Sequence, residues 1–187
     1  MTDHSNIELL AETKYLQMVQ DGHWTYVRRP NITGAIAVIG VTDENCVVLI
    51  DQYRIPMQGR VIELPAGLVG DLAETRDETK EDAAQRELIE ETGYKAGSIS
   101  SIVNGASSAG LTEEKVHLML ATGLTKVGEG GGDDLEDIIV HTIPLDEVDD
   151  WLNAQIAKGT DVDFKVYAGL YFAKQLNQNG MSPRAGK

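Results

Sequence analysis

Three glutamates gather in the stretch AAQRELIEETGY, residues 83–94. On a helix that turns about 100° per residue, the side chains of Glu87, Glu90 and Glu91 fall within a sector of about 100°. Like charges three or four residues apart repel each other, so the cluster costs stability unless a cation neutralises it. Carboxylate oxygens are the ligands that hard divalent cations prefer, and the cluster therefore predicts a site for Mg²⁺ or Mn²⁺. The alternative is a solvated acidic face without a metal.

The helix that must carry these glutamates has a signal at each end. Thr79 suits the N-cap position, and Asp82 three residues later completes a variant of the capping box. Gly93 suits the left-handed position after the last turn. Ala84 and Leu88 form an apolar side. These signals predict an amphipathic helix over residues 79–92.

The remaining elements are expected from hydrophobic periodicity and turn signals. Extended segments are predicted at 14–20, 24–29, 35–41, 46–54, 61–67, 98–103, 116–124 and 138–145, and two closing helices at 146–159 and 163–178. The first two segments flank the turn Asp21-Gly22 and predict a hairpin. A sheet with two apolar faces needs cover on both, so this order of elements predicts an α/β (α+β) sandwich.

Residues Arg86 to Tyr94 match, position by position, the REUxEExGU core of the Nudix box, in which U is a bulky apolar residue. Glu78 lies at the family's spacing of seven residues before Arg86. The chain resembles a Nudix hydrolase over most of its length. The segments QYR (52–54), ELPAG (63–67) and SAGLTEE (108–114) make it most similar to the ADP-ribose and nucleoside-diphosphate-sugar pyrophosphatases of that family.

The sequence departs from the family pattern in one place. Ten residues separate Gly67 from Glu78, whereas the family has five there. An insertion of five residues therefore precedes the helix. It leaves the helix itself intact, but it opens the question of what Glu78 does.

The resemblance implies a fold, a Nudix-type α/β/α sandwich with a mixed sheet, and a set of metal ligands. Glu87 and Glu91 would be the principal ligands, and Glu90 a further ligand or a contact through water. Ala66 would offer its backbone carbonyl to an ion. Arg86 would orient the carboxylates of the helix by ion pairing.

The resemblance also implies a general base on a loop before a late strand, and the stretch GEGGGDDLEDIIV (128–140) fits that loop. Glu136 is the first choice for the base or an extra ligand, and Asp134 is the second. The four glycines of the stretch, Gly128, Gly130, Gly131 and Gly132, would let the loop close. The alternative is a disordered acidic loop without a catalytic role.

Five residues are candidates for binding substrate. Arg54 suits the phosphates, because a guanidinium matches their geometry. Trp24, Arg28 and Arg29 lie in the N-terminal hairpin, which in the resembling dimers packs across the two-fold axis, and Trp24 or an arginine could stack on a nucleobase. Gly110 lies in the SAGLTEE segment.

Composition restricts the class of partner. The 187-residue chain has a formal net charge of -14, which argues against a nucleic-acid or anionic-membrane surface. No stretch is long and apolar enough to span a bilayer, and a single cysteine excludes an internal disulfide, so a cytoplasmic protein is expected. The expected organisation is an N-terminal hairpin extension (1–34) that dimerises, a Nudix domain (35–180) and a flexible tail (181–187).

The expected function is metal-dependent hydrolysis of the pyrophosphate bond of ADP-ribose or another nucleoside diphosphate sugar, such as GDP-mannose. The products would be a nucleoside monophosphate and a sugar phosphate. One alternative is a Nudix hydrolase of nucleoside triphosphates or dinucleoside polyphosphates. The other is a module that binds nucleotide sugars without catalysis.

Overall fold

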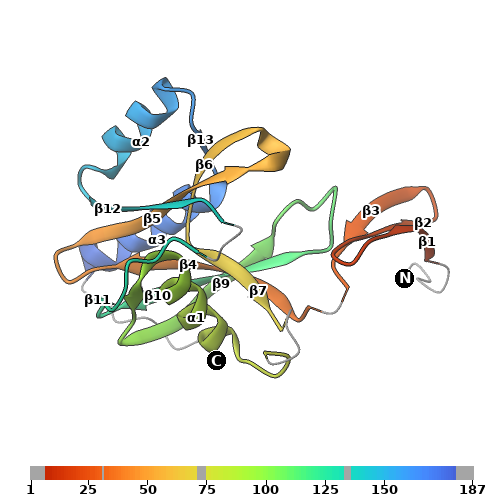
Figure 1. Ribbon diagram of the computed structural model, residues 1–187, viewed down its shortest axis with the longest axis horizontal. Helices are drawn as coiled ribbons and strands as arrows, with labels where there is room; N and C mark the ends of the chain where they lie inside the picture. The colour runs from red at the N-terminus through yellow and green to blue at the C-terminus, as the bar shows by residue number, and fades with distance from the viewer. Residues whose placement is uncertain (1–6, 31, 71–74, 133–135, 180–187) are drawn as a thin grey trace.

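Residues 7–30, 32–70, 75–132 and 136–179 are described by a computed structural model (Figure 1). The strands are β1 (Glu8–Glu12), β2 (Gln17–Asp21), β3 (Trp24–Arg28), β4 (Gly34–Val41), β5 (Cys46–Arg54), β6 (Gly59–Glu63), β7 (Ala66–Val69), β8 (Tyr94–Lys95), β9 (Ser98–Ala106), β10 (Lys115–Thr122), β11 (Thr125–Lys126), β12 (Ile138–Pro144) and β13 (Asp161–Val162). The helices are α1 (Lys80–Thr92), α2 (Val148–Ala157) and α3 (Phe164–Asn179), with a short 3-10 turn at Ile55–Met57. None of the helices in these residues combines the length and apolar composition needed to cross a bilayer.

Helix α1 begins and ends as the sequence predicts. The Thr79 hydroxyl accepts a hydrogen bond from the Asp82 backbone N–H, and the Asp82 carboxylate in turn accepts one from the Thr79 N–H. Gly93 is left-handed, with φ 69°, and its N–H donates to the Ile89 carbonyl. Ala84 and Leu88 are buried, which confirms the predicted apolar side. The local signals were therefore sufficient to define this element.

A mixed sheet forms the middle layer of the molecule. Its order is β13-β6-β5-β4-β10-β9, with β12 paired to β5 and β7 paired to β4. Strand β10 runs parallel to β4 and antiparallel to β9. One face packs on α1 through a cluster that includes Val38, Leu88 and Met119, and the other packs on α2 and α3 through a cluster that includes Leu49 and Val166. The predicted sandwich is confirmed.

The segment 61–67 is predicted as one strand but contributes to two. Strand β6 ends at Glu63, and β7 begins at Ala66 after Leu64 and Pro65. Proline has no N–H to donate to a ladder, so a strand is interrupted there. The Pro65 carbonyl accepts a hydrogen bond from the Val38 N–H, at 2.7 Å, and the chain leaves β5 to pair with β4. This change of partner brings β7 against α1.

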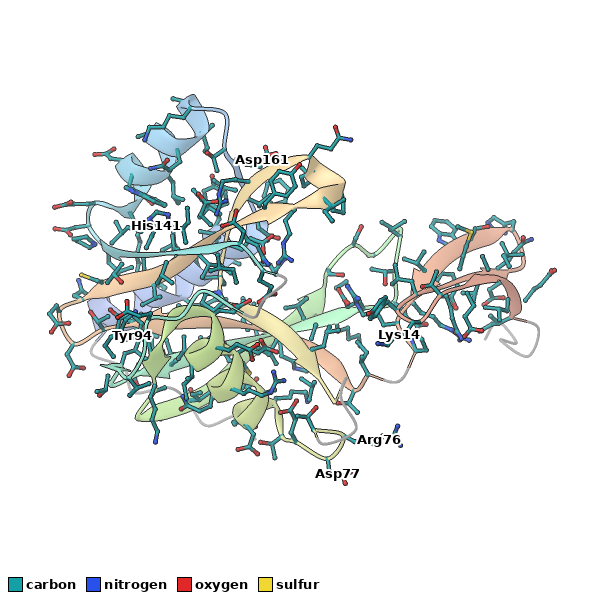
Figure 2. All side chains as sticks on the ribbon, viewed as in Figure 1. Lys14, Arg76, Asp77, Tyr94, His141 and Asp161 are labelled. Atoms are coloured by element: carbon teal, nitrogen blue, oxygen red, sulfur yellow. The ribbon has the colours of Figure 1, made fainter. Side chains whose placement is uncertain are left out.

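The N-terminal segment forms its own sheet of three strands, β1-β2-β3, where the sequence predicts a two-stranded hairpin. Strand β1 was missed, and β2 begins at Gln17, later than expected. The sheet extends from one end of the molecule (Figure 1). It touches the body where the Val27 N–H donates to the Leu111 carbonyl and where Arg29 pairs with Glu114. In Figure 2, Lys14 lies where this extension meets the body, and Tyr94, which follows α1, lies on the far side of the body.

Candidate active site

The three glutamates of α1 face different environments. Glu91 is only 2% exposed. The side chain of Glu87 is 14% exposed and that of Glu90 is 40% exposed, so the acidic face runs from the interior to the solvent. Helix α1 packs its apolar side on the sheet and lies against β7, and this packing directs Glu91 inward. The acidic face is therefore not a simple solvated surface.

Glu91 is held beside the start of β7. Its Oε2 accepts a hydrogen bond of 2.9 Å from the Ala66 backbone N–H. Burial, helped by the negative charges of Glu87 and Glu136, raises the pKa of Glu91 to about 9. The Ala66 N–H and the positive charge of Arg54 act in the opposite direction. Without a cation, Glu91 is protonated at neutral pH.

Glu87 lies against Gly67, the residue that follows Ala66 in β7. A Cβ atom at Gly67 would lie 2.0 Å from Glu87 Oε1 and 2.1 Å from its Cδ. The absence of a side chain at Gly67 is therefore what lets the Glu87 carboxylate reach the backbone of β7. The glycine of ELPAG has a steric role in the site.

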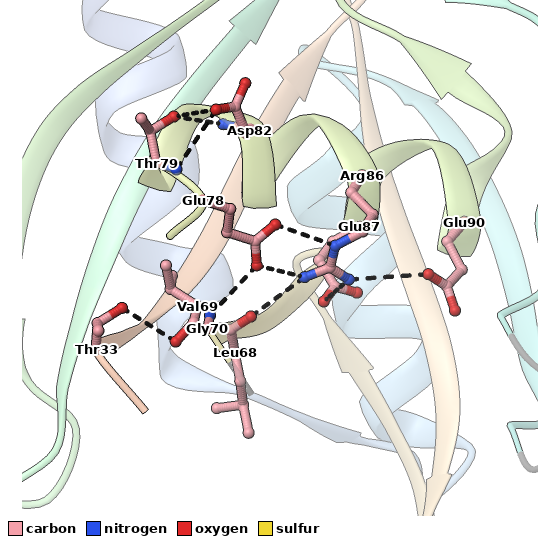
Figure 3. Close-up of polar contacts among 10 residues, drawn as sticks. All are labelled: Thr33, Leu68, Val69, Gly70, Glu78, Thr79, Asp82, Arg86, Glu87 and Glu90. Atoms are coloured by element: carbon pink, nitrogen blue, oxygen red, sulfur yellow. Dashed lines mark hydrogen bonds and ion pairs between the residues drawn. The ribbon is translucent and has the colours of Figure 1, made fainter. Parts of the chain in front are cut away.

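Arg86 ties the acidic face of α1 to the loop before it (Figure 3). Its Nη1 donates to Glu87 Oε1 at 2.7 Å and lies 3.9 Å from Glu90 Oε2. Its Nη2 donates to Glu78 Oε1 at 3.0 Å and to the Leu68 carbonyl at 3.3 Å. One guanidinium thus contacts three carboxylates and the backbone of β7.

The insertion before α1 does not displace Glu78 from this network. Besides its bonds to Arg86, Glu78 accepts a hydrogen bond of 3.3 Å from the N–H of Gly70, which is left-handed with φ 75°. Val69 accepts from the Thr33 hydroxyl at 3.1 Å, so this end of β7 is fixed from both sides (Figure 3). Four of the residues of the inserted loop, 71–74, lie outside the described residues.

Arg54 is engaged by a neighbouring carboxylate. Its Nε donates to both oxygens of Glu63, at 3.0 and 3.2 Å, and its Nη2 also donates to Glu63. The Glu63 carboxylate raises the pKa of Arg54, and the charges of Glu91 and Glu136 contribute to the rise. Arg54 therefore supplies a positive charge next to the acidic cluster. A guanidinium is a group that binds phosphate well.

Glu136 belongs to the same cluster. Its Oε1 accepts a hydrogen bond of 3.3 Å from Gln52 Nε2. Its charge acts on both Glu91 and Arg54, although it follows α1 by more than forty residues in the chain. Asp134, the second candidate for the base, lies outside the described residues.

The glycine-rich stretch packs against the C-terminus of α1. The Gly131 N–H donates to the Glu91 carbonyl at 2.9 Å, and the Gly132 N–H donates to the Glu90 carbonyl at 3.1 Å. These bonds satisfy carbonyls at the C-terminus of α1 that have no partner within the helix. Gly130, Gly131 and Gly132 all have positive φ, between 77° and 112°. In this conformation Gly131 and Gly132 cap the helix, and closure of the loop by the glycines stays a prediction.

The other substrate candidates lie away from the acidic cluster of their own chain. Trp24 is 52% exposed on β3, and Arg29 pairs with Glu114 at 2.8 Å. Arg28 Nε donates to Gln17 at 2.8 Å. Gly110 is in the turn between β9 and β10, next to the extension. Trp24 and Arg28 are the two ends of β3, in the extension that projects away from the sheet and α1 (Figure 1).

The chemistry of the donor set fits a hard divalent cation. It includes several carboxylates, whose oxygens are the ligands that such cations prefer. Burial keeps one of them, Glu91, protonated until a cation replaces the proton. Within the described residues, however, no three His, Cys, Asp or Glu side chains converge closely enough to hold an ion as they stand. The Glu87 carboxylate instead accepts a hydrogen bond from Arg86, and the Glu91 carboxylate accepts one from the Ala66 N–H.

The sequence around this cluster matches a known protein family. Residues 31–167 match the NUDIX domain. The chain belongs to the Nudix family. Helix α1 is thus the Nudix helix, and the motif that defines the family coincides with the acidic face described above.

Three relatives show how far the likeness extends. The chain is 40% identical over 119 residues to a methanol dehydrogenase activator of Bacillus methanolicus, covering 64% of this chain and 60% of that protein. It is 36% identical over 152 residues to an ADP-ribose pyrophosphatase of Mycobacterium tuberculosis, covering 81% and 70%. It is 31% identical over 122 residues to a GDP-mannose pyrophosphatase of Cronobacter sakazakii, covering 61% of each. The match thus spans about three fifths of the first relative's length.

A solved structure shows the same Nudix fold. The crystal structure of an ADP compounds hydrolase superposes with a TM-score of 0.71 at 20% sequence identity, covering 94% of both chains. At this identity the likeness bears on the fold alone.

Sequence reasoning gave no role to Gln52, Arg60 and Glu63, which the structure places in or beside the cluster. Gln52 could have been found, because a period of two places it on the same face of β5 as Arg54. Arg60 could not, because its partners are Asp51 in β5 and Asp137 just before β12, and the pairing of β5 with β12 cannot be read from one sequence.

Proposed function

We propose that this Nudix protein hydrolyses the pyrophosphate bond of a nucleoside diphosphate sugar, with ADP-ribose and GDP-mannose as the first candidates. The observation that carries the proposal is that the buried Glu91 carboxylate feels the charges of Glu87, Glu136 and Arg54. An acidic cluster with one arginine suits a diphosphate that arrives with divalent cations. The names of the Mycobacterium tuberculosis and Cronobacter sakazakii relatives support this class of substrate.

The metal proposed is Mg²⁺, with Mn²⁺ as a possible substitute. Glu87 and Glu91 would be its main ligands, with Glu90 and the backbone carbonyl of Ala66 completing the set. When bound, such ions neutralise charge on the phosphates and acidify water. Binding requires Glu91 to lose its proton and Glu87 to exchange part of its contact with Arg86.

The side chains of the chain would divide the remaining work. Arg54, oriented by Glu63, would contact the phosphates with the donors that Glu63 leaves exposed. Glu136 would accept the proton of the attacking water as its oxygen bonds to phosphorus. The bond between that phosphorus and the bridging oxygen breaks, which gives a nucleoside monophosphate and a sugar phosphate. Arg86 would hold the carboxylates of the helix in place.

We also propose that the chain acts as a homodimer through its N-terminal extension. The extension exposes several apolar side chains, namely Leu9, Leu10, Leu16, Met18 and Trp24. Exposed apolar groups that gather on one small element are typical of a contact surface. Trp24, Arg28, Arg29 and Gly110 would then complete the site of the partner subunit, since they lie away from Glu91 of their own chain.

The test of function is release of nucleoside monophosphate from ADP-ribose, GDP-mannose, UDP-glucose and ATP, each with Mg²⁺ and with a chelator. Metal-dependent cleavage of the diphosphate sugars, lost in Glu91→Gln, is expected. Cleavage of ATP alone would instead favour a triphosphate hydrolase. Absence of cleavage of all four by the folded protein would favour a binding module.

A second candidate function is activation of a methanol dehydrogenase, favoured by the 40% identity to the Bacillus methanolicus activator. Its test adds the protein to a purified methanol dehydrogenase and measures the rate of methanol oxidation. A rise that wild-type protein gives and Glu91→Gln does not would tie activation to the same site.

A further inference from the structure

The side chain of Gln52 has one satisfied end and one unsatisfied end. A carboxylate only accepts hydrogen bonds, so the contact of 3.3 Å with Glu136 Oε1 must use the amide NH₂ of Gln52. The amide oxygen then points elsewhere. Gln52 is 5% exposed, and its Oε1 has no hydrogen-bond partner among the described residues. A buried acceptor without a partner is costly, which indicates that the oxygen receives a donor in the working protein.

Arg60 fixes the backbone next to Glu136. Its Nη1 donates to Asp137 Oδ2 at 2.7 Å, and its Nη2 donates to the Asp137 carbonyl at 3.1 Å. It is anchored on β5 by bonds of 2.7 Å to both the carboxylate and the carbonyl of Asp51. One side chain of β6 thus links the middle of β5 to the residue before β12. The residue next to Glu136 is therefore held through both its side chain and its main chain.

The opposite side of Glu136 is confined as well. A Cβ atom at Gly132 would lie 2.3 Å from Glu136 Oε2, so this carboxylate packs on the backbone that caps α1. Gln52 and the backbone at Gly132 approach the Glu136 carboxylate directly, and Arg60 holds the adjacent residue, Asp137. The Glu136 carboxylate is therefore held in a defined position, as a general base must be.

We propose that Gln52 is a catalytic residue, which orients the Glu136 carboxylate with its NH₂ and accepts a hydrogen bond from the attacking water with its Oε1, and that Arg60 is a positioning residue for Glu136. The inference rests on the proposed function. The attacking water would donate one hydrogen bond to the Glu136 carboxylate and the other to Gln52 Oε1. Its oxygen lone pairs would then be free to attack phosphorus. The two side chains together define one direction of attack.

The test is steady-state kinetics on ADP-ribose with Mg²⁺. Gln52→Leu is expected to lower kcat by about 10- to 100-fold with KM within about twofold, as for loss of a group that acts in the transition state. Arg60→Met is expected to lower kcat about tenfold, and Arg60→Lys to recover part of the loss. Lys174→Met is the matched control, because the Lys174–Asp149 pair has similar exposure and lies outside the cluster; its kcat is expected to be unchanged.

A double-mutant cycle separates this assignment from a structural effect. If Gln52 acts through Glu136 and its water, adding Gln52→Leu to Glu136→Gln lowers kcat by less than about twofold more. If the losses of kcat in the two single variants multiply in the double variant, the inference is overturned. A raised KM at unchanged kcat in Gln52→Leu would also overturn it, because the donor to Gln52 Oε1 would then belong to the substrate. Gln52→Met repeats the measurement if the branched side chain unfolds the protein.

Failure of the inference is distinct from failure of the proposed function. If Glu136→Gln abolishes turnover while Gln52→Leu and Arg60→Met keep the wild-type kcat, only the roles of Gln52 and Arg60 are wrong. If Glu136→Gln itself keeps the wild-type kcat, the assignment of the base falls, and with it the roles of both residues. If wild-type protein cleaves none of the four substrates, the proposed function has failed first.

Discussion

The backbone N–H of Ala66 donates to the carboxylate of Glu91 at 2.9 Å, which joins β7 to the Nudix helix at a buried point. Strand β7 exists as a separate element because the chain turns at Pro65 and changes partner from β5 to β4. The ELPAG segment and the Nudix box are therefore parts of one site, even though more than ten residues separate them in sequence. Several predictions about stability and activity depend on this junction.

Glu91 should make the metal-free protein less stable as the pH rises. Its pKa is about 9 in the folded protein and 4.5 in the reference state, so between these values the folded state binds more protons than the unfolded state. Stability therefore falls with rising pH over that range. In chelator, we expect the Tm of the wild type to fall relative to that of Glu91→Gln from about pH 5 to pH 9. Parallel Tm profiles for the two proteins would contradict the raised pKa.

Added Mg²⁺ should act on the same group. An ion that binds the Glu91 carboxylate must displace its proton, so metal affinity rises with pH. We expect the increase in Tm caused by 10 mM Mg²⁺, a concentration of about the order used to saturate such sites, to be larger at pH 9 than at pH 6. Glu91→Gln is the control, and in that variant the increase should be small at both pH values.

Gly67→Ala should damage activity more than stability. The new methyl group would lie 2.0 Å from Glu87 Oε1, so the carboxylate must move while the backbone stays. Misplacing a ligand by about 1 Å lowers kcat/KM by roughly 100-fold. We expect a loss of about 10- to 100-fold with a change in Tm of a few degrees at most. Gly105→Ala, where a Cβ meets nothing within 4 Å, is the matched control and should keep full activity.

Gly130→Ala should destabilise the protein more than Gly131→Ala. Both glycines have positive φ, which alone costs another residue about 1 to 3 kcal/mol. A Cβ atom at Gly130 would also lie 2.4 Å from the Thr92 carbonyl carbon and 2.7 Å from Glu91 O, whereas one at Gly131 meets nothing within 4 Å. Thermal unfolding should show the lower Tm for Gly130→Ala. Equal Tm values would mean that the glycines do not cap α1 in solution.

How much the sequence could reveal depended on the range of the interactions. Helix α1 was predictable because its capping box and its terminal glycine act within four residues. The metal ligands were identified as candidates because one turn of helix brings them together. The division at Pro65 was readable in principle, since proline interrupts a ladder, but the new partner of β7 was not.

Contacts between distant segments were beyond reach. Gln52 and Glu136 meet because β12 pairs with β5, and one sequence does not give that register. The glycines at 130–132 were interpreted as a source of flexibility, which their composition suggests. In the structure their positive φ values direct consecutive N–H groups at the end of α1, and that role depends on where α1 ends in space.

The proposed exchange of the extension between subunits can be tested by mixing two inactive variants. Glu91→Gln has an intact extension, and Trp24→Ala/Arg29→Ala has an intact Nudix helix. If the extension completes the partner's site, a mixed dimer has one fully wild-type site, whereas sites built within a single chain would have none. After denaturation and refolding of an equal mixture, half of the dimers are mixed, so about a quarter of the wild-type rate is expected. A rate no higher than that of the separate variants would place Trp24 and Arg29 outside the partner's site.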